Sequence, residues 1–182
     1  MSVKVISGLY GGRNLETPES RSDNSPVRPT KARVREAGFN MIFSRMDFTE
    51  AKCFDLFCGS GAAGIEALSR GAKHVTFVDI DTTWAEKNLQ TCQTDSAQFK
   101  VTRGNVLNFH STEKADLVLA DPPYGAGLME ETLKNKDQFG KPGTLWLAEV
   151  ESKLRIEPEQ YGFEILKNKK YGRSTLWLLR QL

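Results

Sequence analysis

The segment between residues 55 and 64 has the residue types best suited to binding a ligand that contains a nucleoside. It leads from an apolar strand through a glycine turn into a helix and reads Asp55-Leu56-Phe57-Cys58-Gly59-Ser60-Gly61-Ala62-Ala63-Gly64. The first two glycines allow a tight turn and the approach of a ligand to bare backbone, and the third lets the helix lie close to the strand. Asp79 follows Gly59 by twenty residues, at the end of the next apolar run, where a carboxylate can accept bonds from two ribose hydroxyls. This spacing also fits a dinucleotide site, so a nicotinamide-dependent oxidoreductase remains open here.

A second motif, Asp121-Pro122-Pro123-Tyr124, directly follows the apolar run 115–120. Ligands of open parallel sheets bind at the carboxyl ends of strands, so this tetrapeptide should face the same crevice as the glycine turn. Its prolines fix φ and donate no backbone hydrogen bonds, which leaves carbonyl acceptors beside the Asp121 carboxylate. This set suits an NH2 group, because Asp121 and the Pro122 carbonyl can each accept one hydrogen while Tyr124 stacks on a base. Hydride transfer has no use for such acceptors.

The elements that position these motifs alternate between short apolar runs and helical stretches from residue 51 onward. We expect strands at 53–57, 74–78, 99–102, 115–120 and 144–150, with helices at 62–69, 82–91 and 128–136. The tail predicts two more strands, at 163–166 and 174–179, joined by a loop over 167–173 that is short enough for a hairpin. The predicted fold class is therefore α/β: a doubly wound, Rossmann-like sheet of about seven strands whose last strand is antiparallel.

Residues 1–50 predict an extension ahead of this core. Alternating residues near the start, followed by Gly11-Gly12, predict a small β-hairpin through about residue 17. An irregular loop over 18–29 then leads to Thr30, the expected N-cap of a helix over 31–46. We expect a single domain over 1–182, with 51–182 as its catalytic core.

The composition excludes several classes of protein. The chain has 182 residues, and no apolar run approaches the 18 or so that span a bilayer. Its first residues do not form a signal peptide, so we expect a cytoplasmic protein. The chain has an odd number of cysteines and no CxxC pair, which argues against a disulfide framework and a zinc site. We expect buried thiols at Cys53, Cys58 and Cys92. The two histidines have no partners at metal-ligand spacing, and we expect no metal.

The charge is unevenly distributed. Residues 1–50 hold 8 Lys and Arg against 6 Asp and Glu, residues 51–150 hold 10 against 13, and residues 151–182 hold 7 against 4. Basic ends indicate a polyanionic partner, although a run of charges is also typical of a solvated face. The candidate phosphate-binding residues are Arg28, Lys31, Arg33 and Arg35 near the start and Lys169, Lys170 and Arg173 near the end.

The glycine turn and the tetrapeptide together resemble class I S-adenosylmethionine-dependent methyltransferases that act on amino nitrogens. Over nearly the whole chain the sequence resembles the RsmD family of small-subunit (16S) ribosomal RNA guanine-N2 methyltransferases. The motifs that carry this resemblance, besides those above, are Arg28-Pro29-Thr30, Arg33-Val34-Arg35-Glu36-Ala37, Phe39-Asn40 and Ile65-Glu66-Ala67-Leu68-Ser69-Arg70-Gly71-Ala72. The chain departs from the family pattern at Gly38, where a larger apolar residue is usual, and at Cys58 and Ala63 in the turn.

The resemblance implies the roles of the site residues. Asp55 and the backbone from Gly59 through Ser60 to Gly61, with Gly64 behind it, would hold the methionine part of S-adenosylmethionine. Asp79 would hold the ribose, and Asn105 with Val106 the adenine edge. The target guanine would lie on Asp121, Pro122 and Tyr124, with Asp121 also facing the cofactor.

The implied reaction is methyl transfer to the exocyclic N2 of guanine by direct displacement, without a metal. Small-subunit ribosomal RNA or the assembled small subunit is the implied partner, and we expect a monomer. A DNA adenine or protein glutamine methyltransferase would use the same tetrapeptide, but we expect no separate target-recognition domain in this chain.

Overall fold

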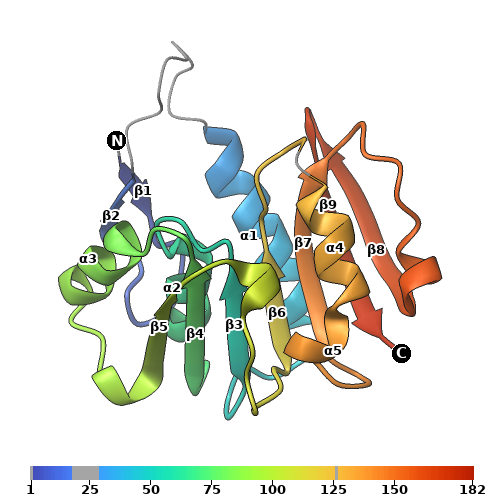
Figure 1. Cartoon of the computed structure of the whole chain (residues 1–182). Helices are drawn as coiled ribbons and strands as arrows, with labels where there is room; N and C mark the ends of the chain where they lie inside the picture. The colour runs from blue at the N-terminus through green and yellow to red at the C-terminus, as the bar shows by residue number, and fades with distance from the viewer. Residues whose placement is uncertain (1, 18–28, 126) are drawn as a thin grey trace.

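The computed structural model describes residues 2–17, 29–125 and 127–182 and is built around a seven-stranded sheet (Figure 1). The strand order is β5-β4-β3-β6-β7-β9-β8. Strands β3 to β7 are parallel, and β9 is antiparallel to both of its neighbours. The doubly wound α/β prediction is confirmed. The strands are β3 (Lys52–Leu56), β4 (His74–Asp79), β5 (Phe99–Arg103), β6 (Leu117–Ala120), β7 (Leu145–Glu151), β8 (Phe163–Tyr171) and β9 (Ser174–Gln181).

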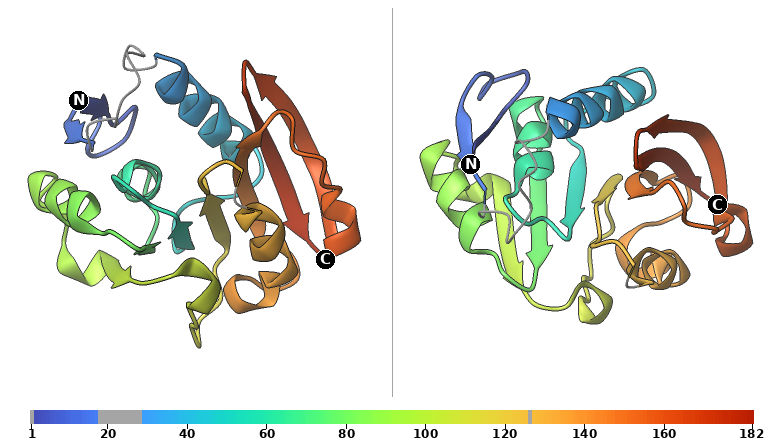
Figure 2. Two further views of the ribbon diagram at one scale, coloured as in Figure 1. Left: turned by 45° about the horizontal axis from the view of Figure 1, so that its top comes forward. Right: turned by 90° about the horizontal axis from the view of Figure 1, so that it is seen from above.

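Helices cover both faces of the sheet, with α1, α2 and α3 on one face and α4 on the other (Figure 2). Alternate residues of β6 enter two separate cores, Leu117 and Leu119 on the α1 side and Val118 and Ala120 on the α4 side. The two-residue period of a strand buried on both faces explains this division. The helices are α1 (Pro29–Phe43), α2 (Ala62–Ser69), α3 (Thr83–Thr91), α4 (Leu128–Lys134) and α5 (Lys136–Phe139), with 3-10 turns η1 (Ser96–Gln98), η2 (Val106–Asn108) and η3 (Pro158–Tyr161).

Helix boundaries differ from the prediction at both ends of α1, which ends at Phe43 and not at about residue 46, and at the α4–α5 junction. Helix α1 begins at Pro29, so Thr30 lies inside the helix and is not its N-cap. Proline is favoured in the first turn of a helix because its missing N–H would have no partner there. The helix predicted over 128–136 is divided at Asn135, whose side-chain amide donates to the carbonyl of Glu131 at 2.8 Å.

The tail differs more. Residues 167–171, predicted as a loop, continue β8, and only Gly172 and Arg173 separate it from β9. Pairing with the apolar strand β9 keeps this polar segment extended, so tertiary context overrides local composition. Lys169 and Lys170 therefore lie on the edge strand of the sheet, where lysines also discourage pairing with another chain.

The N-terminal hairpin of β1 (Ser2–Lys4) and β2 (Asn14–Glu16) is confirmed, and its loop is fixed to α2. Glu66 is fully buried and accepts bonds from the backbone N–H groups of Ile6 at 2.7 Å and Ser7 at 3.2 Å. Gly8 passes so close to Ser69 that an added Cβ would lie 1.8 Å from the Ser69 carbonyl oxygen.

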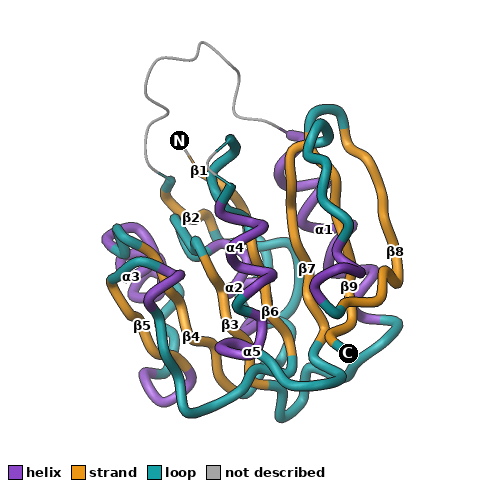
Figure 3. Tube along the Cα trace, turned by 45° about the vertical axis from the view of Figure 1, so that its right-hand side comes forward, coloured by secondary structure: helices purple, strands orange, loops and turns teal. Residues whose placement is uncertain are grey.

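The start of α1 and the β8–β9 turn lie at the same end of the sheet as the carboxyl ends of the parallel strands (Figure 3). The register places Ser174, the first residue of β9, opposite Glu151, the last residue of β7. Arg33 near the start of α1 and the basic end of β8 therefore lie near the edge where ligands of such sheets bind. Among the described residues, no helix has the length and apolar content to cross a membrane.

Candidate active site

The site lies where the winding of the sheet reverses. From β3 the chain proceeds outward to β4 and β5, and from β6 it proceeds to β7 on the other side. Loops that leave such neighbouring strands in opposite directions leave a crevice between them. Leu56 and Ala120, the last residues of β3 and β6, are paired in the sheet, so the glycine turn and the tetrapeptide begin side by side. The structure thus brings together the two motifs that the sequence predicted to share a crevice.

The glycine turn uses its glycines as the sequence predicted. Gly59 and Gly61 have φ of 51° and 73°, in the left-handed region that favours glycine. A Cβ on Gly59 would meet no atom within 4 Å, so the backbone there borders open space. A Cβ on Gly64 would come within 2.3 Å of the Phe77 ring, which shows how closely α2 packs on β4.

Asp55 is a buried carboxylate below this turn. It is 4% exposed and accepts a bond from the Gly64 N–H at 2.8 Å, which ties α2 to β3. Burial raises the pKa of Asp55 to about 8 despite that bond, and the charges of Asp121 and Asp79 act in the same direction. Carboxylates that disfavour one another's charge provide a favourable environment for a cationic ligand.

Asp79 holds the turn from the neighbouring strand. One carboxylate oxygen accepts from the Gly59 N–H at 2.8 Å and the other from the Asp81 N–H at 3.0 Å. Each oxygen retains a second lone pair, so both bonds are compatible with hydroxyl groups of a ligand. Asp79 therefore shapes the glycine turn as well as lying beside it.

The two residues predicted for the adenine edge have different placements. The side chain of Asn105 is exposed, and its oxygen accepts from the Leu107 N–H at 2.9 Å, capping η2. Val106 is 2% exposed and packs in the α4-side core, so only its backbone can face a ligand.

Sequence reasoning missed two residues at this site. Ile80 follows Asp79 at the carboxyl end of β4 and is 72% exposed, which offers an aliphatic surface on which a flat ring can lie. The available signal was an apolar residue directly after a strand-ending acid. Asn88 is fully buried in α3, and its amide donates at 2.8 Å to the carbonyls of Ser60 and Glu16. No sequence signal marks it, because asparagine in an amphipathic helix usually indicates an exposed position.

The tetrapeptide is more exposed than the glycine turn. Asp121 is at the surface, Pro122 is buried and the side chain of Tyr124 is 44% exposed. The Tyr124 hydroxyl lies 2.6 Å from Ser174 Oγ and donates to Glu149 Oε1 at 3.5 Å. Burial raises the pKa of Tyr124, and the charges of Glu149 and Asp121 do likewise, so the phenol stays protonated at neutral pH.

The candidate phosphate-binding residues are divided by the structure. Arg33, Lys169, Lys170 and Arg173 are exposed. Arg28 lies outside the described residues, and of Lys31 only the backbone is described.

The placement of Arg35 argues against its predicted contact with RNA. Its side chain is 10% exposed, with Nε 3.9 Å from the buried Glu66 carboxylate and a terminal nitrogen bonded to the Lys4 carbonyl. Arg70 pairs with the same carboxylate at 2.8 Å. Arg35 therefore links α1 to α2 and the hairpin, and its charge faces Glu66.

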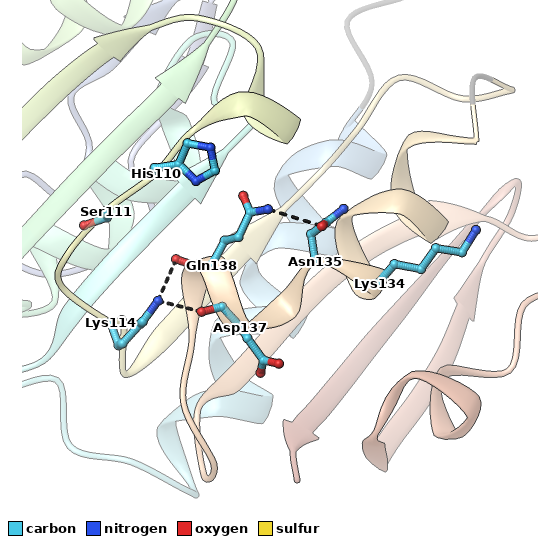
Figure 4. A pocket seen from close by; sticks show the side chains of 7 residues that line it. All are labelled: His110, Ser111, Lys114, Lys134, Asn135, Asp137 and Gln138. Carbon is cyan, nitrogen blue, oxygen red and sulfur yellow. Dashed lines mark hydrogen bonds between the residues drawn. The ribbon is translucent and has the colours of Figure 1, made fainter.

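A shallow cavity of about 400 Å³ lies away from the crevice, between residues 110–114 and the α4–α5 junction (Figure 4). Its two lysines already have partners. Lys114 donates to the carbonyls of Asp137 and Gln138, and Lys134 pairs with Glu131 at 2.8 Å. Among the described residues, no three His, Cys, Asp or Glu side chains are grouped as a metal site requires.

The sequence family described as Conserved hypothetical protein 95 matches residues 3–180 of this chain. Ribosomal RNA small subunit methyltransferase D of Haemophilus influenzae is 37% identical, with 93% of this chain and 89% of that protein covered. The chain belongs to the RsmD methyltransferase family. The protein of the same name from Escherichia coli K12 is 35% identical, with 86% of this chain and 75% of that protein covered.

Solved structures agree with this membership. An Escherichia coli methyltransferase structure superposes with a TM-score of 0.81 at 29% identity, covering 100% of this chain and 98% of that one. A Haemophilus influenzae methylase structure gives 0.79 at 33% identity, with 100% and 99% covered. As an RsmD-family methyltransferase, the protein uses a methyl donor of the S-adenosylmethionine type. Membership decides for methyl transfer over the hydride transfer that the glycine spacing alone left open.

Proposed function

We propose that this protein transfers a methyl group from S-adenosylmethionine to the exocyclic N2 of a guanine in small-subunit ribosomal RNA. The observation that carries the proposal is the pairing of Leu56 with Ala120, which starts the glycine turn and the tetrapeptide side by side at the reversal of the sheet. The names of the relatives support ribosomal RNA of the small subunit as the substrate class.

The cofactor would lie over the glycine turn. The open space at Gly59 would admit a ligand to the backbone of Gly59 and its neighbours Ser60 and Gly61, while Gly64 lets α2 pack closely on β4. The buried carboxylate of Asp55, with Asp121 and Asp79 nearby, suits a ligand that carries a sulfonium and an ammonium group. The fit therefore rests on both shape and charge.

The nucleoside part of the cofactor would extend along the ends of β4 and β5. Asp79 would accept bonds from the ribose hydroxyls, and Ile80 would pack against the adenine ring. Asn105 and the backbone of Val106 would face the adenine edge, since the Val106 side chain is buried.

The tetrapeptide would orient the guanine. The Asp121 carboxylate and the Pro122 carbonyl would each accept one hydrogen of the amino group, while Tyr124 stacks on the ring. The guanine amino nitrogen is a poor nucleophile because its lone pair is conjugated with the ring, so alignment is the main requirement. S-adenosylmethionine supplies a methyl group already activated by its sulfonium. Asp121 then stabilises the positive charge that develops on the nitrogen, and the proton leaves after transfer.

The RNA would contact one end of the molecule. Arg33 on α1 and Lys169, Lys170 and Arg173 on the β8–β9 hairpin are exposed there. That Arg28 and Lys31 also bind RNA phosphates stays a prediction from the sequence. The protein acts as a single-domain monomer in this proposal.

Labelled methyl transfer to small ribosomal subunits from a strain lacking this protein tests the proposal. We expect the label in N2-methylguanosine after nucleoside digestion. Parallel assays on protein-free small-subunit RNA and on duplex DNA separate the substrates, and calorimetric titration with S-adenosylmethionine and with NAD separates the cofactors. Label in an adenine, or no transfer with either RNA substrate, would overturn the proposal.

A further inference from the structure

The hydroxyl of Tyr124 is held by two strands that lie outside its own motif. Ser174 Oγ on β9 lies 2.6 Å from the hydroxyl oxygen, and Glu149 Oε1 on β7 lies 3.5 Å from it. Stacking on a base uses the face of the ring and has no need of this hydroxyl. The two contacts of the hydroxyl therefore do something other than stack on the base themselves.

Strand period places both partners on one face of the sheet. Glu149 is two residues beyond Leu147, and Ser174 is two residues before Leu176. Both leucines belong to the core under α1. The tyrosine hydroxyl thus reaches the side of the sheet on which α1 lies, although the main chain of the tetrapeptide leaves from β6.

The tetrapeptide gives the ring uneven support. Pro122 and Pro123 fix the backbone before Tyr124, while Gly125, at φ of 78°, follows it. Tyr124 is 44% exposed, so packing restricts its rotamer less than it would in a buried residue. A hydrogen bond to the hydroxyl removes this freedom, because it fixes the far end of the side chain while the prolines fix the backbone that carries it.

We propose that Ser174 is a positioning residue that fixes the Tyr124 ring for stacking on the target base. This inference rests on the proposed function, in which Tyr124 stacks on the guanine. Ser174 is separated from β8 only by Gly172 and Arg173, so the hairpin that carries Lys169, Lys170 and Arg173 also sets the ring. The same hairpin would then bind the RNA and orient the ring that stacks on the target base.

A double-mutant cycle tests the inference with methyl transfer to small subunits as the assay. Ser174→Ala and Tyr124→Phe should each lower kcat about 3- to 10-fold, the range expected for loss of one hydrogen bond, with KM for S-adenosylmethionine unchanged. The double variant should be no slower than the slower single variant, because both substitutions remove the same bond. Ser174→Thr keeps a hydroxyl and should restore most of the activity.

Ser152→Ala is the matched control. Ser152 also bonds to this hairpin close to its turn, with Oγ 3.0 Å from Thr175 Oγ1, and the bonds of its side chain go to Thr175 and Gly172 and not to Tyr124. We expect it to leave kcat unchanged, and we expect the thermal midpoints of the Ser174 variants to match it.

Independent, multiplicative losses in the double variant, or a Ser174→Ala enzyme as fast as wild type, would overturn the inference while leaving the proposed function intact. A loss of kcat in Ser152→Ala equal to that in Ser174→Ala would assign the effect to the fold of the hairpin and would overturn it too. A wild-type protein without methyl transfer to RNA would contradict the proposed function, and this inference with it.

Discussion

The two halves of the crevice are held together by different kinds of contact. On the β3–β4 side, buried or partly buried carboxylates bind backbone N–H groups, Asp55 to Gly64 and Asp79 to Gly59, both at 2.8 Å. On the β6–β7–β9 side, exposed and half-buried side chains bind one another, as Tyr124 and Ser174 do at 2.6 Å. The first half has its geometry built into the main chain, and the second half depends on side chains.

This difference teaches how the two ligands would be treated. A cofactor that is the same in every reaction suits a rigid site made of backbone, because no side chain has to be ordered when it binds. A base that belongs to a large RNA has to be received from outside, so its site lies at the surface. Substitutions should accordingly affect binding and stability in the first half and turnover in the second.

The largest effect should come from Asp121 in the exposed half. Asp121→Ala should reduce kcat by about a hundredfold or more, because it removes an acceptor that acts mainly in the transition state. The affinity for S-adenosylmethionine, measured by calorimetry, should stay within a few fold. Asp121→Asn keeps an acceptor oxygen and should be faster than the alanine variant. If the two variants were equally inactive, Asp121 would act as a base and not as an orienting acceptor.

Asp79 sharpens the comparison from the backbone-built half. Asp79→Ala should weaken S-adenosylmethionine binding by about 1.5 to 3 kcal/mol, because it deletes a charged acceptor and releases the Gly59 N–H. The same variant should unfold at a lower midpoint concentration of urea. Asp81→Ala, which removes a nearby exposed carboxylate, is the control and should bind as wild type does. An unchanged affinity in Asp79→Ala would exclude Asp79 from the cofactor site.

Asp55 should make the first half sensitive to pH. Its pKa is about 8 in the folded protein against 3.8 ordinarily, so the folded state holds a proton that the unfolded state loses between these values. The contribution to stability is therefore complete below pH 3.8 and disappears as the pH rises through about 8.

A cationic cofactor should favour the charged form of Asp55, so its binding should release a proton near neutral pH. Calorimetry in buffers of different ionisation enthalpy measures this release. In Asp55→Asn, which keeps an acceptor for Gly64, both the release and the pH dependence of unfolding should decrease. Equal proton release in wild type and Asp55→Asn would assign the proton to another group.

The smallest effect concerns the charged surface beside the exposed half. Lys170→Ala should lower the slope of log affinity for RNA against log salt by about 0.7 to 0.9, as expected for loss of one phosphate contact. Arg35→Ala should leave the slope unchanged and lower the thermal midpoint, because it removes a partner of the buried Glu66. Filter binding over a range of salt concentrations, with thermal unfolding alongside, separates the two. The reverse pattern would show that burial is a poor guide to which basic residues meet RNA.

Much of the site was predictable because its signals are local. The glycines at 59, 61 and 64 lie within six residues and the tetrapeptide occupies 121–124, so each motif can be seen in a short stretch of sequence. Short apolar runs predicted the parallel strands for the same reason, since a strand buried on both faces needs apolar residues at every position.

The sequence by itself therefore determined the α/β sheet, the order of its parallel strands along the chain and the two motifs at their ends. The tertiary structure decided which residues meet across long separations: it turned Arg35 inward onto Glu66, drew the polar segment 167–171 into β8 and placed Ser174 against Tyr124. The physical reason is that Arg35 and Tyr124 find their partners 31 and 50 positions away, and that residues 167–171 are held extended by pairing with the apolar strand β9. Burial, pairing and hydrogen bonding between distant segments follow from the packed sheet and leave no local pattern to read.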